Sequence, residues 1–427
     1  MRQRMLTMLV LFLSADVYAF QAVRTLIKDM SSAWRWSIIA IYWLIPILLI
    51  FAFSMIFTGN EDLLDRNVWV YLMSFLLITY VSKVVIGGFL LVGDLLIFIP
   101  RVFKSLFQYL PFGEKSVDAT AQVFNKSRPK FIAKVALIIG AIPFTTLIYG
   151  IVRNAYRYRV VRQTVTLDNL PAKLDGLKIV QISDIHSGSF TMKEPVRKAI
   201  DLINKESADI VFFTGDIVNE RASEMDKFMD VFDKIKSKHG IYSILGNHDY
   251  GDYGDWEDDD EKVANFARLK EIHKELGWDL LLNENRILEI NDEKLSIIGV
   301  ENYAANPRFR TAGDLEKAYK GAEAAPVKLL LSHDPSHWDA QVNKDFKDID
   351  ITFSGHTHGF QFGIKIPGFI NWSPSKYLYK QWAGLYQEGN QYIYVNRGLG
   401  FLGYPGRVGM LPEITVMELK SGKLKEI

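Results

Sequence analysis

Residues 353–360 read FSGHTHGF and place two histidines, His356 and His358, two positions apart between glycines. The chain has only 8 histidines in 427 residues. A buried structural histidine needs one hydrogen-bond partner, whereas two imidazoles presented together can both face a cation. Taken alone, the stretch is also compatible with an ordinary turn, so its meaning depends on the rest of the chain.

Apolar residues are distributed unevenly along the sequence. Long apolar runs such as IYWLIPILLIFAF (41–53) occupy the first 155 residues, whereas short β-rich runs alternate with charged stretches beyond them. A chain of this length exceeds the usual size of one compact domain. We therefore expect a transmembrane helical domain over 1–155, a linker with the first strand over 156–175, and a water-soluble domain over 176–427.

The net charge changes sign at nearly the same place. Residues 1–159 hold 17 Lys and Arg against 8 Asp and Glu, and the remainder holds 33 against 41. A basic membrane part suits anionic headgroups, while an acidic soluble part suits cations and argues against nucleic acid as a partner. The chain has no cysteine, which excludes disulfides, thiolate nucleophiles and Cys-ligated metal sites.

Four segments are apolar enough to span a membrane: 5–27, 36–58, 68–99 and 131–152. The first is also compatible with a signal peptide. Asp16, Lys83 and Asp94 lie inside these segments, where they would either line a transport path or pair between helices. Lys and Arg are nearly balanced between alternate loops, so the positive-inside rule does not orient the chain.

Six short runs predict strands in the soluble part: 178–183, 209–214, 240–245, 295–300, 328–332 and 349–354. The spacers 193–207 and 224–238 have helix-compatible composition. Apolar strands that alternate with helices indicate a sheet covered on both faces. In such sheets the chemistry gathers beyond the carboxyl ends of the strands.

Five of these runs are followed at once by side chains that bind hard or borderline divalent metals. They are Asp184 and His186, Asp216, Asn247 with His248 and Asp249, His333 with Asp334, and His356 with His358. A lone Gly-Asp after a strand is usually a turn, and a lone Asp-x-His usually has no function, whereas Gly-Asn-His-Asp and Gly-His-Thr-His are rarer. The ordered set, all at strand ends, predicts a metal site. His239 and His273 lack such a setting and are expected at the surface, and His337 is expected beside the ligands.

The order DIH, GD, GNHD, H and GHTH resembles the signature of the calcineurin-like metallophosphoesterases over roughly residues 176–420. The resemblance implies an α/β fold, a four-layer α/β/β/α sandwich preceded here by the transmembrane helices, with two divalent metal ions. Manganese is the expected metal, with iron, zinc or magnesium as alternatives. Carried over by position, Asp184, His186, Asp216 and His358 would bind one ion, and Asp216, Asn247, His333 and His356 the other.

This ligand set has a physical logic. Two cations about 3.5–4 Å apart repel each other, so a bridging carboxylate, here Asp216, and a bridging hydroxide stabilise the pair. Such a metal-bound hydroxide can attack phosphorus in line. We expect His248 to help protonate the leaving oxygen, with Asp249 orienting it.

Two further segments bear on the substrate. The stretch YVNRGLGFLGYPGRVGMLPEI (394–414) resembles the closing segment of membrane-associated members, and its Arg397 and Arg407 are candidates for binding substrate phosphate. Phe360 replaces the glycine that usually follows H-x-H-G and changes the pocket wall. The aromatic run FINWSPSKYLYKQWAGLY (369–386) is compatible with a membrane-facing lip or with packing on the core.

These features predict a multi-pass membrane enzyme, a metal-dependent phosphoric ester hydrolase. The resemblance to membrane-associated members suggests a phosphodiester or pyrophosphate bond in a lipid-linked nucleotide sugar such as UDP-diacylglucosamine, cleaved at the cytoplasmic face in lipid A biosynthesis. The alternatives are a phosphodiesterase for soluble or cell-wall substrates and a non-enzymatic membrane sensor or transporter. The complete ligand set counts against the sensor.

Overall fold

The computed structural model describes residues 2–60, 63–107, 128–366 and 369–422. Residues 423–427, the end of the predicted soluble domain, lie outside the described residues. The chain divides into two compact units, Met1–Tyr149 and Gly150–Ile427, and each is considered by itself.

The first unit is built from four helices: α1 (Arg2–Ile27), α2 (Ser32–Thr58), α3 (Arg66–Phe107) and α4 (Arg128–Val152, whose last residues belong to the second unit). Four segments are long and apolar enough to cross a membrane, namely Gln3–Ile27, Ser32–Thr58, Arg66–Leu96 and Lys130–Val152. The four predicted spans are thus confirmed as helices. The long third run is one continuous helix of 42 residues.

Charged residues inside these helices pair with neighbours. Asp16 of α1 is fully buried, forms an ion pair with Lys83 of α3, and accepts a hydrogen bond from the Tyr80 hydroxyl at 2.6 Å. The Tyr18 hydroxyl donates to Asp94 at 2.7 Å. Because an unpaired charge in apolar surroundings is costly, these contacts favour interhelical pairing over a transport path.

The described part of the second unit contains two six-stranded sheets and a two-stranded hairpin. The first sheet has the order β1-β14-β2-β3-β4-β5, the second the order β12-β13-β9-β8-β7-β6, and β10 pairs with β11. The strands are β1 (Arg159–Leu167), β2 (Lys178–Ile182), β3 (Ile210–Thr214), β4 (Ile241–Ile244), β5 (Asp279–Leu280), β6 (Glu284–Ile290), β7 (Glu293–Gly299), β8 (Val327–Leu331), β9 (Ile351–Ser354), β10 (Ile364–Ile366), β11 (Ile370–Trp372), β12 (Gly384–Glu388), β13 (Gln391–Val395) and β14 (Glu413–Ser421).

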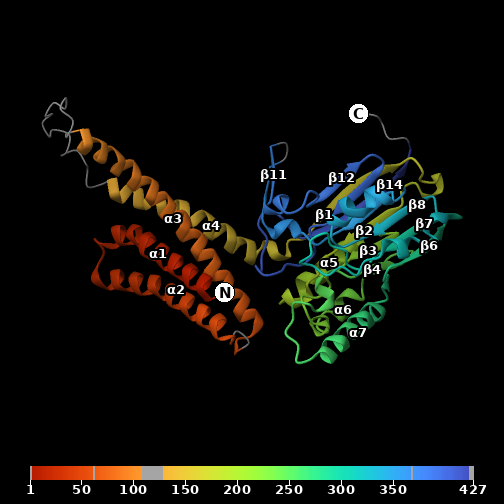
Figure 1. Cartoon of the computed structure of the whole chain (residues 1–427), viewed down its shortest axis with the longest axis horizontal. Coiled ribbons are helices and arrows are strands. Elements are labelled where there is room, and N and C mark those ends of the chain that lie inside the picture. Colours follow the sequence, from red (N-terminus) through yellow and green to blue (C-terminus); the bar gives the residue numbers. More distant parts are fainter. Residues whose placement is uncertain (1, 61–62, 108–127, 367–368, 423–427) are drawn as a thin grey trace. The chain divides into compact units, whose positions relative to one another are not determined.

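Three apolar cores separate four layers. In β3, Val211 and Phe213 pack under the helices, whereas Ile210 and Phe212 face the second sheet, as the period of two in a strand requires. The helices on the first sheet are α5 (Lys193–Lys205), α6 (Met229–Phe232) and α7 (Asp259–Glu275) (Figure 1). On the second sheet, α8 (Leu315–Tyr319) packs over Ile298 and Leu330, and α9 (Asn343–Asp345) follows. The four-layer sandwich is therefore confirmed.

Two local predictions are wrong. The helix expected over 224–238 is reduced to the four residues of α6, because Phe228, Val231 and Ile235 reach the core from successive turns without a continuous helix. His273 is fully buried on the inner face of α7 instead of lying at the surface. Its Nδ1 lies 2.9 Å from the Ser243 hydroxyl, and burial lowers its pKa to about 3.

Candidate metal centre

The predicted ligand residues all follow strands that end at one edge of the sandwich. Strands β2, β3 and β4 of the first sheet precede Asp184 and His186, Asp216, and Asn247, while β8 and β9 of the second precede His333, His356 and His358. Glycines let the loops meet. A Cβ on Gly355 would overlap the side chains of Ser183 and Asp184, and one on Gly246 would overlap the carboxylate of Asp216.

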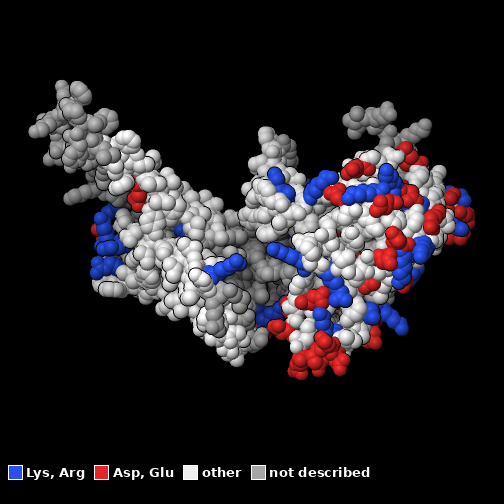
Figure 2. Space-filling model, viewed as in Figure 1, with Lys and Arg blue, Asp and Glu red and all other residues white. Residues whose placement is uncertain are grey.

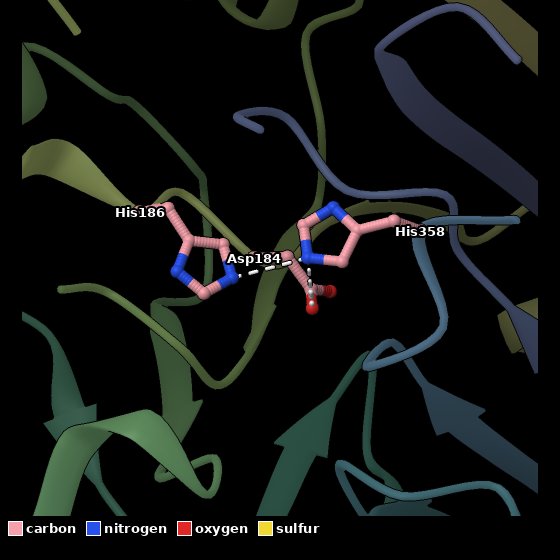
Figure 3. Close-up of side chains that lie close together, drawn as sticks. All are labelled: Asp184, His186 and His358. Carbon is pink, nitrogen blue, oxygen red and sulfur yellow. Dashed lines mark hydrogen bonds and ion pairs between the residues drawn. The ribbon is translucent and has the colours of Figure 1, made fainter. Parts of the chain in front are cut away.

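The first group of side chains is Asp184, His186 and His358, all buried (Figure 3). The Nε2 atoms of His186 and His358 lie 3.0 Å apart, and His358 Nε2 lies 3.2 Å from Asp184 Oδ1. Their ligand atoms all lie within 4.8 Å of one another, a geometry that could hold a metal ion. The Oδ2 of Asp216 lies 3.7 Å from His186 Nε2, so this carboxylate adjoins the group.

The second group is Asp216, His333 and His356. The Nε2 of His333 lies 3.1 Å from the same Asp216 Oδ2. Asn247 joins this group, because its Oδ1 lies 2.8 Å from His356 Nδ1. Asp216 therefore adjoins both groups, and the bridging role that the family resemblance implies for it stays a prediction.

The chemistry of these atoms fits divalent cations. The Nδ1–H of His333 donates to the Thr214 carbonyl at 2.7 Å, which directs the buried Nε2 toward the Asp216 carboxylate. Burial opposes protonation of His333, but the carboxylate of Asp216 outweighs it and raises the pKa of the imidazole to about 10. A bound cation would take the place of that proton on Nε2.

The backbone at the site is strained. Asp184, His186, Asp216, His356 and His358 have φ values of 49°, 47°, 61°, 69° and 49°. The left-handed region is unfavourable for residues with a Cβ, and such strain clusters at functional sites. The fold thus holds five of the seven predicted ligands in a conformation that packing must maintain.

His248 lies beside the two groups, and its ring is 5.0 Å from that of His186 between centroids. The expectation that Asp249 orients this ring is wrong. Instead, the Nδ1–H of His248 donates to the Asn219 carbonyl at 2.7 Å, which leaves Nε2 for other partners.

Asp249 has another structural role. Its side chain is fully buried and accepts the backbone N–H groups of Asp216, Ile217 and Gly246, each at 2.8 Å, and that of Val218 at 3.4 Å. Burial raises its pKa to about 7, although the hydrogen bonds from Gly246 and Asp216 act in the opposite direction. Asp249 therefore holds together the loops after β3 and β4.

The two candidate substrate arginines differ in position, because Arg407 lies against a predicted ligand and Arg397 lines a separate cavity. Arg407 is fully buried, and its guanidinium donates to the carbonyls of Gly400 and Met410 and lies 3.2 Å from His358 Nδ1. Its expected contact with substrate is wrong because its donors are used inside the protein. Arg397 forms a buried ion pair with Glu413 and lines a separate cavity.

Sequence patterns missed several contacts of the site. The Tyr379 hydroxyl lies 2.7 Å from His356 Nε2, and Asp334 Oδ2 lies 3.5 Å from the same nitrogen. Asp334 directly follows His333 and belongs to the set of side chains that the sequence predicts for metal binding, whereas nothing local marks Tyr379. His337 is buried, with its Nδ1 2.8 Å from the Ser332 hydroxyl and its Nε2 2.9 Å from Gln341.

Comparisons with known proteins agree with this arrangement. Residues 177–360 match the family described as calcineurin-like phosphoesterase, and residues 2–155 match the domain described as probable calcineurin-like phosphoesterase, transmembrane domain. The chain is 30% identical over 279 residues to the uncharacterized metallophosphoesterase YkuE of Bacillus subtilis, covering 64% of this chain and 90% of that protein.

A zebrafish (Danio rerio) protein named transmembrane protein with metallophosphoesterase domain is 28% identical over 293 residues, which are 67% of this chain. The match spans only 62% of that relative. The strand-end histidines and carboxylates, the four-layer sandwich and these similarities lead to one conclusion. The chain belongs to the calcineurin-like metallophosphoesterases, a family of metal-dependent phosphoester hydrolases, and carries the transmembrane domain associated with it.

Proposed function

We propose that this protein is a membrane-anchored phosphoesterase that hydrolyses a phosphodiester or pyrophosphate bond with two divalent ions. The observation that carries the proposal is the pair of side-chain groups adjoining Asp216. Asp184, His186, Asp216 and His358 would hold one ion, and Asp216, Asn247, His333 and His356 the other. When bound, two such ions, manganese by expectation, would acidify water and neutralise charge on the phosphoryl oxygens.

His248 is proposed to protonate the leaving oxygen. Its side chain is partly exposed, and the Asn219 carbonyl accepts the Nδ1–H of the ring. As a general acid, His248 would carry a second proton on Nε2 and pass it to the leaving oxygen, which would leave the neutral ring with its proton on Nδ1. The Asn219 carbonyl, and not Asp249, would keep Nε2 in position as the leaving group departs.

The substrate is proposed to be lipid-linked, such as the nucleotide sugar UDP-diacylglucosamine, and cleaved at the cytoplasmic face. The support is the transmembrane domain, because a site tethered to a bilayer meets substrates that reside in it. A phosphodiesterase acting on soluble or wall-linked substrates is the second candidate.

A hydrolysis panel would test the proposal. The purified full chain would be assayed with manganese against a simple phosphodiester, a phosphomonoester and an acylated UDP-sugar, and the Asp216→Asn variant would serve as the matched inactive control. We expect cleavage of the acylated UDP-sugar and the diester in preference to the monoester. Exclusive cleavage of soluble diesters would support the second candidate, and no manganese-dependent cleavage of any substrate would contradict both.

A further inference from the structure

An exposed apolar hairpin follows the candidate ligand loop. Strands β10 and β11 expose 47% of Ile364, 47% of Ile366 and 43% of Ile370, and Phe369 beside the turn is 88% exposed. The second half of the aromatic run behaves differently, because Trp382 is only 6% exposed and packs against Met410. The run 369–386 thus combines a projecting part with a part that belongs to the core.

The hairpin has two chemically distinct faces. Ile364 pairs with Trp372 and Ile366 with Ile370, whereas Lys365 pairs with Asn371 between them. Because side chains alternate across a strand, the isoleucines share one face and the Lys365–Asn371 pair lies on the other. The polar pair lines a cavity of about 320 Å³, so the opposite, apolar face points away from this cavity.

The cavity is cationic. Arg159, Lys365 and Arg397 line it together with a single carboxylate, Glu413, which is already paired with Arg397. Within the described residues, neither Arg159 nor Lys365 forms an ion pair. Partial burial lowers the pKa of Lys365, and the positive charges of Arg397 and Arg159 lower it further. In Figure 2 the surface over β11 is white and blue, without red.

We propose that the β10–β11 hairpin docks into an anionic lipid bilayer. Ile364, Ile366, Phe369 and Ile370 would enter the apolar layer, while the cationic cavity would receive the phosphate of a lipid headgroup. A bilayer offers an apolar interior and a phosphate layer side by side, which suits a two-faced hairpin. A second copy of the hairpin would match the apolar face but would bring like charges together.

The position of Arg159 in the chain supports this choice of partner. The candidate span Lys130–Val152 ends seven residues before Arg159, where β1 begins. Seven residues reach at most roughly 25 Å even when fully extended. One side chain of the cavity is therefore tethered close to the end of a candidate membrane helix, where headgroups would be present.

Docking would also act on the candidate metal centre. At the end of the hairpin, the Ser373 hydroxyl donates to the Gly359 carbonyl at 2.7 Å, next to His358. Farther along, Tyr379 contacts His356. A hairpin seated in lipid would thus hold the loop of both histidines at the membrane surface. The inference goes beyond the proposed hydrolysis and does not depend on it.

The absence of cysteine allows a direct test in the full chain. A nitroxide spin label would be attached at Phe369→Cys, with Val263→Cys as the matched control, since Val263 is also well exposed (67%) but lies on α7. Both variants would be placed in nanodiscs with phosphatidylglycerol. We expect collisions with oxygen to exceed those with a water-soluble nickel chelate at residue 369, and the reverse at residue 263.

Three results would overturn the proposal. If the label at residue 369 collides with the nickel chelate as often as the label at residue 263 does, the hairpin lies in water. A label shielded from both reagents would place it against protein. Spin–spin broadening that disappears on dilution with unlabelled chain would indicate a second copy.

A second measurement tests the cationic cavity. In the chain that carries the label at residue 369, replacing phosphatidylcholine with phosphatidylglycerol in the nanodisc should increase the depth of the label in the bilayer. The double change Arg159→Gln with Lys365→Gln should abolish this effect of the lipid on depth. The change Lys236→Gln, at an exposed position outside the cavity, should leave it intact. Equal lipid dependence in the double variant and the control would refute the role of the cavity. Neither readout requires enzymatic activity, so failure of the proposed function would remain distinguishable.

Discussion

Replacement of Asp249 by asparagine separates two roles for this residue. If Asp249 oriented His248, the Asp249→Asn variant would lose turnover but keep its stability and metal. The structure instead has each carboxylate oxygen accept two backbone N–H groups, Oδ1 those of Ile217 and Val218 and Oδ2 those of Asp216 and Gly246. The asparagine amide would place an NH₂ group against two of these donors.

The cost follows from the number of hydrogen bonds lost. Two buried N–H groups would lack an acceptor, and each unsatisfied buried group costs about 1–3 kcal/mol, so we expect a loss of about 2–6 kcal/mol in the free energy of unfolding. For domains of about this size, 1 kcal/mol lowers the midpoint of thermal unfolding by roughly 2–4 °C. The expected decrease is therefore roughly 4–24 °C.

The assay is thermal unfolding of the detergent-solubilised full chain, combined with elemental analysis of bound metal. We expect Asp249→Asn to lower both the unfolding midpoint and metal occupancy, because Asp216 lies in one of the two loops that Asp249 holds. Asp255→Asn, an exposed change a few residues away, is the control and should alter neither. An Asp249→Asn protein with normal stability and metal content but low turnover would refute the reasoning and restore the role of orienting His248.

Four other changes give independent tests. Asp216→Asn should lower metal occupancy together with activity, and full occupancy by elemental analysis would exclude the bridging role. His248→Asn should keep both metals but lower turnover by about 10²–10⁴-fold, as expected for loss of a general acid; normal turnover would exclude that role. Phe360→Gly should leave the free energy of unfolding equal or raise it by up to about 1 kcal/mol, because Phe360 has a φ of 58° and is 54% exposed. A fall in the unfolding midpoint would show instead that the ring packs against the protein. Burial raises the pKa of Asp350 to about 6 in the folded protein, so the free energy of unfolding should fall by up to about 3 kcal/mol as pH rises from about 4 to 6. The difference in unfolding midpoint between the native chain and Asp350→Asn should therefore change over this pH range. A constant difference would contradict the raised pKa.

The sequence by itself determined the class of fold, the four apolar helices and the order of the metal-ligand motifs. These features depend on local patterns. Apolar length specifies a helix that can span a membrane, and short apolar runs specify buried strands. Residues that directly follow such strands, such as Asp184 and His356, must then come to one edge of the sheets.

Only the tertiary structure decided which partner each polar side chain meets. Asp249 was expected to serve its neighbour His248, yet it accepts backbone N–H groups from the loop after β3. Arg407 was expected at the substrate, yet its donors are used by buried carbonyls. The opposite faces of the β10–β11 hairpin also appear only when its strand register is known. Hydrogen-bond partners distant in sequence are selected by packing, because burial removes the water that would otherwise satisfy each group, and no local pattern records that choice.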